Sequence, residues 1–252
     1  MKLICIIVAV LSVPSMAGQP EQWAFKVVET YAQDPRAFTQ GLLHDGRTLI
    51  LGTGQYGHSS IRRVDLASGA TLARRNLDRH LFGEGVARHG EILYQLTWKS
   101  GVVLKYKLRT MEPAGTARYR AEGWGLTSDG KVLIMSNGSD VLTGRDPATF
   151  APVWSLKVTR NGRPLAALNE LEYIDGNVFA NVWKSNEIVV IDLQSGAVKA
   201  VLDCSGLAAE ARRRSRGAGV LNGIAYHTRR KLLLVTGKNW DVIYALKMTR
   251  SK

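Results

Sequence analysis

The chain has 252 residues, of which 34 are Lys or Arg and 21 are Asp or Glu, so its formal net charge is +13. An apolar fraction of 45% with 22% charged residues is typical of a folded globular protein and excludes a disordered chain. Two cysteines, Cys5 and Cys204, are too few for a disulfide framework or a four-thiolate zinc site. The 25 glycines favour a β protein that is rich in turns.

The first seventeen residues have the three-part pattern of a secretory signal peptide. Lys2 precedes an apolar run, residues 3–13, and small residues follow at Ser15 and Ala17. The run is shorter than the roughly 20 apolar residues that span a membrane. We therefore expect residues 1–17 to be removed, which leaves Cys204 as the only cysteine. The mature domain, residues 18–252, is expected to be secreted or periplasmic without membrane insertion. The alternative is that the apolar run forms a buried first strand.

An internal repeat accounts for the rest of the chain. Five short segments centred on Gly41, Gly85, Gly125, Leu171 and Gly223 are 40 to 52 residues apart. Each segment leads through a tight turn, often Asp-Gly, into an apolar strand, and two further strand patterns follow. Asp-Gly between β-type runs predicts a hairpin, because both turn residues tolerate positive φ. Each repeat is therefore expected to form four short antiparallel strands.

Four strands per period of this length predict the blade of a β-propeller. We expect an all-β, single-domain, five-bladed β-propeller; a barrel or a sandwich, the alternatives, would not require the same unit five times. The last repeat ends at its third strand, residues 242–246. The segment 23–31 alternates at period two, so we expect this N-terminal strand to close the last blade. One helix is expected at residues 205–214, with Ser205 as its N-cap.

In a propeller the first strand of each blade lines the central channel, so residues near its start converge on the axis. Aromatic, amide and carboxylate side chains occupy these positions: Phe38, Gln40, Phe82, Glu84, Trp124, Asn169 and Asn222. The loops after the second strands add a further set: Gln55, Trp98–Lys99, Asn137, Trp183–Lys184 and Lys238–Trp240. An aromatic funnel with a few polar groups is typical of a small-ligand pocket. The alternative is that the tryptophans pack between blades, as we expect for Trp23 and Trp154.

Glu84 is the carboxylate that we single out as catalytic. It lies among Phe82, Gly83 and Gly85, so we expect an apolar setting that raises its pKa and suits it to proton transfer near neutral pH. The alternative role is a structural carboxylate bonded to neighbouring strands. Glu170 and Glu172 compete with it, but both belong to the fourth repeat alone.

Several other patterns carry no chemistry. The five histidines lack the spacing of zinc ligands, and the G-x-G-x-x-G run at residues 52–57 leads into a β pattern instead of a helix. We therefore expect no metal and no cofactor. The Arg-rich run at residues 211–216 is interpreted as solvated surface and not as a nucleic-acid site. A propeller that closes on itself requires no partner subunit, so we expect a monomer.

Motifs in all five repeats resemble those of the plant- and bacterial-type glutaminyl cyclases. The similarity covers roughly residues 23–248 and is carried by Phe38–Gly41, Phe82–Gly85, Leu96–Lys99, Glu122–Leu126, Leu168–Tyr173, Asn181–Trp183, Leu221–Ala225 and Thr236–Trp240. The resemblance implies a secreted five-bladed propeller that acts without a metal. It also implies that the chain converts the N-terminal glutamine of peptides or proteins to pyroglutamate and releases ammonia.

The same resemblance assigns a role to each candidate residue. Glu84 would be the acid and base. Phe38, Phe82, Trp98, Trp124 and Trp183 would form the aromatic pocket, and Gln40, Asn169 and Lys238 would be its polar contacts. Two alternatives stay open: a non-catalytic propeller that binds a peptide N-terminus or small ligand in the same funnel, and a metal-dependent propeller lactonase. The lactonase would need several channel carboxylates, and the sequence offers only Glu84 and Glu170.

Overall fold

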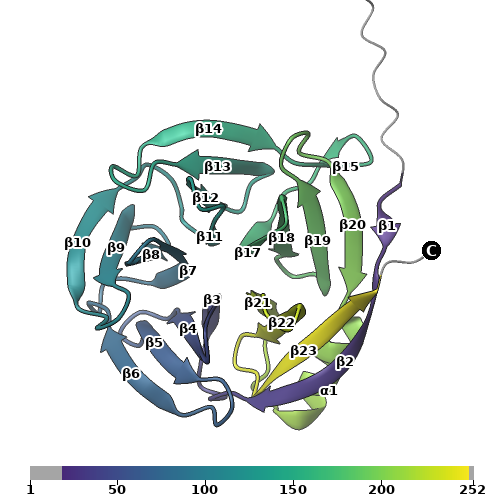
Figure 1. Ribbon diagram of the computed structural model, residues 1–252, viewed down its shortest axis with the longest axis horizontal. Helices are drawn as coiled ribbons and strands as arrows, with labels where there is room; N and C mark the ends of the chain where they lie inside the picture. The colour runs from purple at the N-terminus through teal and green to yellow at the C-terminus, as the bar shows by residue number, and fades with distance from the viewer. Residues whose placement is uncertain (1–18, 250–252) are drawn as a thin grey trace, which may run out of the picture.

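The computed structural model describes residues 19–249, in which five sheets of four or five mainly antiparallel strands are arranged around a central axis (Figure 1). The predicted five-bladed β-propeller is therefore confirmed, and the barrel and sandwich alternatives are wrong. The expected signal peptide, residues 1–17, lies outside the described residues. Within residues 19–249, no helix combines the length and apolar character needed to cross a membrane.

The first four blades follow one another along the chain, each with its first strand at the axis. The first blade consists of β3 (Thr39–Asp45), β4 (Thr48–Thr53), β5 (Ser60–Asp65) and β6 (Thr71–Asn76). The second consists of β7 (Gly83–His89), β8 (Ile92–Thr97), β9 (Val102–Lys107) and β10 (Pro113–Arg118). The third consists of β11 (Leu126–Ser128), β12 (Leu133–Met135), β13 (Val141–Arg145) and β14 (Pro152–Lys157). A small hairpin, β15 (Thr159–Arg160) and β16 (Arg163–Pro164), leads to the fourth: β17 (Leu168–Ile174), β18 (Asn177–Val182), β19 (Glu187–Asp192) and β20 (Val198–Asp203).

Both ends of the described chain build the fifth blade. Its inner three strands are β21 (Leu221–His227), β22 (Leu232–Gly237) and β23 (Val242–Thr249). The outer strand β2 (Ala24–Ala32) pairs antiparallel with β23, so the N-terminal strand closes the last blade as predicted. The preceding β1 (Glu21–Gln22) pairs in parallel with β20, which extends the fourth blade to five strands. The N-terminal segment thus fastens two blades together (Figure 1).

Buried apolar side chains fill the gaps between neighbouring blades. Five such clusters are present in the described part of the chain, and that between the first two blades contains Ile50, Ile61, Val86 and Leu93. Because each blade has two faces to bury, the apolar residues come from alternate positions of both neighbours. Blade-to-blade packing therefore holds the ring together and fixes the geometry at its axis.

The helix α1 (Ser205–Arg214) connects the fourth and fifth blades, as the sequence predicts. Its buried residues Leu207, Ala208 and Ala211 join the apolar cluster between these blades. The predicted N-cap is wrong, because Ser205 is already the first helical residue and Cys204 occupies the cap position. Asp203 accepts the backbone N–H of Ser205 at 2.8 Å, which satisfies one of the N–H groups left free at the start of the helix.

A β-bulge at the start of the innermost strand recurs in four blades. The register shifts between Thr39 and Gly41 in the first blade and between Gly83 and Val86 in the second. Comparable shifts occur at residues 168–171 and 221–224. A bulge leaves one residue unpaired and redirects its side chain. The bulges contain Gln40, Glu84, Asn169 and Asn222, whose side chains are directed toward the axis.

In the first, second and fifth blades a glycine directly follows Gln40, Glu84 or Asn222, and it lets the inner strands approach one another. At Gly85 an added Cβ would lie 2.6 Å from the backbone nitrogen of Leu126, closer than packing allows. The strand register places Glu170, and not Leu171, at this position of the fourth blade. The alignment of the repeat on Leu171 is therefore wrong by one residue. A carboxylate replaces glycine at the innermost point of the fourth blade.

Candidate active site

All nine site residues proposed from the sequence line one pocket of about 230 Å³ at the axis of the ring: Phe38, Gln40, Phe82, Glu84, Trp98, Trp124, Asn169, Trp183 and Lys238. They come from all five blades. Gln40, Glu84 and Asn169 lie at the bulges, whereas Trp98, Trp183 and Lys238 directly follow the second strands β8, β18 and β22. The pocket therefore depends on closure of the whole ring.

The residues after the second strands occupy structurally equivalent positions. The backbone N–H groups of Gly54, Trp98, Trp183 and Lys238 each donate to the carbonyl two residues before the bulge residue of the same blade, at 2.8–2.9 Å. Trp98 and Trp183, each fourteen residues after the channel residue of its blade, Glu84 or Asn169, are thus equivalent, and Lys238 belongs to the same set. In the first blade this position is Gly54, so the pocket wall has no side chain there.

Aromatic rings in edge-to-face contact form most of the wall. The ring of Phe82 lies 6.1 Å from that of Phe38 and 5.6 Å from that of Trp98, measured between centroids. Trp124 and Trp183 meet at 5.4 Å with an interplanar angle of 86°. Such contacts hold the rings in defined orientations. The result is a rigid apolar box around the few polar groups at its base.

Glu84 lies at the base of the pocket in a chain of amides. It is only 4% exposed, and its Oε1 accepts a hydrogen bond from Nε2 of Gln40 at 2.8 Å. Oε1 of Gln40 in turn accepts from Nδ2 of Asn222 at 3.1 Å, which fixes the amide of Gln40 with its NH₂ toward Glu84. Burial raises the pKa of Glu84 well above the usual range, although the Lys238 ammonium and the Gln40 bond lower it. The carboxyl therefore retains a proton at a pH where an exposed glutamate has lost it.

Lys238 and Asn169 supply the other polar atoms of the pocket. Lys238 is 8% exposed, and its Nζ lies 4.7 Å from the centroid of the Phe38 ring. Burial lowers the pKa of Lys238, whereas the nearby Glu84 raises it. Oδ1 of Asn169 is buried and accepts no hydrogen bond from any described residue. A buried acceptor without a donor favours a ligand that brings an N–H group.

Glu122 is a functional candidate that the sequence analysis missed. Its Oε2 accepts both indole N–H groups, from Trp98 at 2.7 Å and from Trp124 at 3.0 Å. Its negative charge also raises the pKa of Glu84. A signal was available, since Glu122 stands two residues before the channel position, where the first two repeats have Phe38 and Phe82.

The competing carboxylates of the fourth blade do not line the pocket. Glu170 is fully buried and accepts the backbone N–H groups of Leu42 and Ile224, at 3.1 and 2.7 Å. Glu172 accepts the N–H of Tyr226 at 2.8 Å. Both therefore bond to neighbouring strands, which is the structural role that the sequence left open for Glu84. Across residues 19–249, no group of three or more His, Cys, Asp or Glu side chains is arranged to hold a metal.

Trp240 was predicted to line the funnel, and this prediction is wrong. Its side chain is fully buried, packs against Tyr244 and donates its indole N–H to the carbonyl of Gly219 at 3.0 Å. Asn239, with a φ of 59°, separates it from Lys238 and turns the two side chains apart. Trp240 is therefore a core residue, while Lys238 faces the pocket.

Comparisons with known proteins place the chain in a family. The family model described as glutamine cyclotransferase matches residues 2–248. The chain is 39% identical over 229 residues to the glutaminyl-peptide cyclotransferase of Arabidopsis thaliana, covering 90% of this chain and 72% of that protein. The crystal structure of Myxococcus xanthus glutaminyl cyclase superposes with a TM-score of 0.86 at 32% identity, covering 93% of this chain and all of that one.

A more distant likeness concerns the fold alone. The β-propeller domain of Cps50 from Myceliophteria thermophila gives a TM-score of 0.52 at 11% identity, over 90% of this chain and all of that one. The family match and the two glutaminyl cyclase relatives span nearly the whole ring, including all the blades that build the pocket. The chain therefore belongs to the glutamine cyclotransferase family.

Proposed function

We propose that this chain is a glutaminyl-peptide cyclotransferase in which Glu84 is the general acid and base and the aromatic pocket holds an N-terminal glutamine. The observation that carries the proposal is the buried Glu84 carboxyl, hydrogen-bonded to Gln40 at the base of an aromatic pocket. A carboxyl with a raised pKa exchanges protons near neutral pH, where glutamine cyclisation requires both removal and delivery of a proton.

The reaction joins two ends of the same residue. The α-amino nitrogen attacks the side-chain amide carbon, a C–N bond forms, and a tetrahedral intermediate results. The attacking nitrogen gives a proton to Glu84, which then donates one to the side-chain nitrogen, so that ammonia leaves and the lactam remains. If the glutamine is bound already folded in this way, its conformational entropy is lost on binding, and less is lost on the way to the transition state. The rigid aromatic box suits that task.

Polar groups beside Glu84 suit the two substrate groups that change charge during the reaction, the amine and the amide oxygen. Oδ1 of Asn169 lacks a donor and would accept an N–H of the substrate amine. The Lys238 ammonium would stabilise the oxyanion of the intermediate. The indole N–H groups of Trp98 and Trp124 are already bound to Glu122, so we assign them to the shape of the pocket and not to the oxyanion.

Ammonia release from a short peptide tests the function directly. The chain is expected to release one ammonia per Gln-Ala-Ala-amide and to leave the acetylated peptide unchanged, because acetylation blocks the nucleophile. A coupled ammonia assay with mass spectrometry of the product measures both. Peptide binding without ammonia would favour the non-catalytic alternative, and loss of turnover on chelation would favour a metal-dependent hydrolase.

Glu122 offers a second test within the same site. Replacing it with Ala removes the shared acceptor of two indoles, and kcat/KM is expected to fall roughly tenfold. Glu122→Gln keeps an oxygen acceptor but loses the charge, so most activity should remain while the Glu84 pKa moves down. The pH profile of kcat/KM separates these effects. Wild-type activity in Glu122→Ala would show that the indoles need no anchor.

We also propose that the domain acts outside the cytoplasm, in the periplasm or the medium, after removal of residues 1–17. The charged, apolar and small-residue pattern of this segment supports export. Expression of the full chain in a bacterium that exports proteins, followed by N-terminal sequencing, is expected to give a chain that starts at Gly18. A cytoplasmic product that retains Met1 would contradict the proposal.

A further inference from the structure

A second hollow lies directly beside the active-site pocket, between the rim of the first blade and the segment that enters it. Its volume is about 440 Å³, and Phe38 lines both hollows. The groove, as we call this second hollow, is otherwise lined chiefly by polar and charged residues, among them Arg36, Arg62, Arg74 and Asp34. An occupant of the pocket that extends past Phe38 therefore enters the groove.

Gly54 separates the groove from the Phe82 ring of the pocket wall. It lines the groove and occupies the wall position that carries Trp98, Trp183 or Lys238 in three other blades. A Cβ at Gly54 would clash with Cε1 of Phe82 and lie 3.1 Å from Cγ of Gln40, so these two pocket side chains fill the space that a larger residue would need. The first blade thus has backbone where other blades have a bulky side chain. The two hollows adjoin at Phe38 on this side of the pocket, so this is the side on which we expect a chain attached to the bound glutamine to leave.

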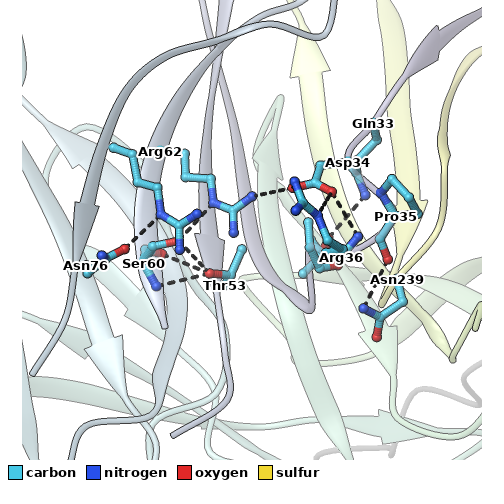
Figure 2. Close-up of polar contacts among 12 residues, drawn as sticks. Gln33, Asp34, Pro35, Arg36, Thr53, Ser60, Arg62, Asn76 and Asn239 are labelled. Atoms are coloured by element: carbon cyan, nitrogen blue, oxygen red, sulfur yellow. Dashed lines mark hydrogen bonds and ion pairs between the residues drawn. The ribbon is translucent and has the colours of Figure 1, made fainter. Parts of the chain in front are cut away.

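The groove has an excess of positive charge. Three arginines face one carboxylate, Asp34, which is already bonded to two of them: Arg36 Nε at 3.0 Å and Arg62 Nη1 at 3.1 Å (Figure 2). Arg74 bonds through Nε to the neutral Asn76 at 2.7 Å. Among the described lining residues, the three arginines and one carboxylate give a net charge of +2, and Arg74 has no carboxylate partner.

The side chain of Arg62 is held in place by hydrogen bonds. Its side chain is 6% exposed and is held by Ser60, which accepts its Nε at 2.9 Å, and by Asp34 (Figure 2). Its Nη2 has no hydrogen-bond partner among the residues of the described chain. Burial and the repulsion of Arg74 lower the pKa of Arg62 more than its ion pair with Asp34 raises it, which shows that positive charge gathers here. A planar guanidinium held in this way presents a donor pair to a carboxylate.

We propose that this groove binds the peptide segment that follows the N-terminal glutamine and that Arg62 and Arg74 select a carboxylate in that segment. The inference rests on the proposed function, since it takes the glutamine to lie in the aromatic pocket. An extended chain advances about 3.3–3.6 Å per residue, so one of the three residues after the glutamine reaches the groove. Acidic substrates are therefore preferred over neutral and basic ones.

A peptide series tests the preference. In Gln-Ala-Ala-Ala-amide, each alanine in turn is replaced with Glu, Gln or Lys, and kcat/KM for ammonia release is measured. At one position the wild-type chain should prefer Glu over Gln by about three- to tenfold and disfavour Lys, as expected of a partly exposed ion pair. Gln-Ala-Ala as free acid and as amide distinguishes a terminal carboxylate from an acidic side chain, and a preference for either supports the groove.

Charge reversal at the rim provides the decisive comparison. Arg74→Glu should reverse the order, so that Lys is preferred over Glu. Arg75→Glu is the matched control: Arg75 is the next residue of β6, points to the other face and acts on Tyr106 and Glu112. It should keep the wild-type order. Equal kcat/KM for Glu, Gln and Lys at all positions and for both C-termini, or the same order in wild type and Arg74→Glu, would overturn the proposal.

Binding without turnover separates this inference from the proposed function. Calorimetry with the pyroglutamyl forms of the same peptides measures affinity without turnover, and the difference between acidic and neutral peptides reports on the groove. Absence of ammonia from every peptide would contradict the cyclotransferase activity, and the affinity order would still decide the groove. A higher affinity for the acidic products in wild type, lost in Arg74→Glu, supports it; equal affinities overturn it.

Discussion

Replacing Glu84 with Gln is expected to lower kcat for N-terminal glutamine peptides by about 10²–10⁴-fold, the usual contribution of general acid–base catalysis. The change keeps an oxygen that accepts the Gln40 amide, so the polar chain through Gln40 and Asn222 is preserved. It also removes a buried group whose charged form is costly, so the variant should fold at least as well at neutral pH. Steady-state ammonia release and thermal unfolding measure the two properties.

The pH profile distinguishes a proton-transfer role from a positional one. The active complex should carry one proton shared between Glu84 and the substrate amine, which gives a bell-shaped profile of kcat/KM. Because burial raises the pKa of Glu84, the acid limb is expected well above 4.5. In Glu84→Gln the remaining rate should depend only on the free amine and rise with pH without a descending limb. A bell retained in that variant would exclude Glu84 as the titrating group.

A control for this variant is available on the same sheet. Glu91 lies in the turn between β7 and β8, and its side chain is 70% exposed. Glu91→Gln makes the same chemical change at the opposite end of β7 and should retain wild-type kcat and pH dependence. Comparable turnover of the Glu84→Gln and Glu91→Gln variants would remove Glu84 from the acid–base role.

The sequence predicts much of this molecule because one pattern is repeated five times. Hydrophobic alternation and turn residues recur in each blade, so a strand that is ambiguous in one repeat can be assigned from the same position in the others. The strand that closes the ring was also predictable, since 23–31 alternates and the last repeat lacks an outer strand. The sequence did not predict that Glu170, and not Leu171, occupies the innermost position of the fourth blade. The glycine that marks this position in other blades is absent there.

Features that depend on contacts between distant segments could not be predicted. Glu122 binds two indoles only because the ring brings the ends of β8 and the third blade together. Lys238 and Trp240 are two residues apart, and the left-handed conformation of Asn239 sends one to the pocket and one to the core. The groove combines Asp34, from the segment after β2, with Arg62 and Arg74 on two strands of the first blade.

Glu170 is expected to contribute more to stability than any other carboxylate of the fourth blade. Its two oxygens accept the N–H groups of Leu42 in the first blade and Ile224 in the fifth, so one side chain bridges three blades at the axis. In Glu170→Gln only one atom is an acceptor, and the amide NH₂ must face a backbone donor. The free energy of unfolding should fall by about 1–3 kcal/mol, and by more in Glu170→Ala, which leaves both donors unpaired.

Glu172 provides the matched comparison, because it uses only Oε1, toward the N–H of Tyr226. Glu172→Gln keeps that acceptor, so little stability should be lost. Burial raises the pKa of Glu172 to about 8. Between about 4.5 and 8 the folded chain therefore holds a proton that the unfolded chain has released, and stability falls as pH rises through this window. Glu172→Gln should show a shallower decline than wild type.

Denaturant unfolding of both variants at several pH values separates the two roles. The loss in Glu170→Gln should exceed that in Glu172→Gln across the whole range, because it arises from an unpaired donor and not from titration alone. Turnover of Glu170→Gln, measured below its unfolding transition, should lie far closer to wild type than that of Glu84→Gln. Equal stability of the two variants would show that the contact between Glu170 and Ile224 does not bridge the blades. A loss of turnover as large as in Glu84→Gln would make Glu170 a candidate catalytic carboxylate again.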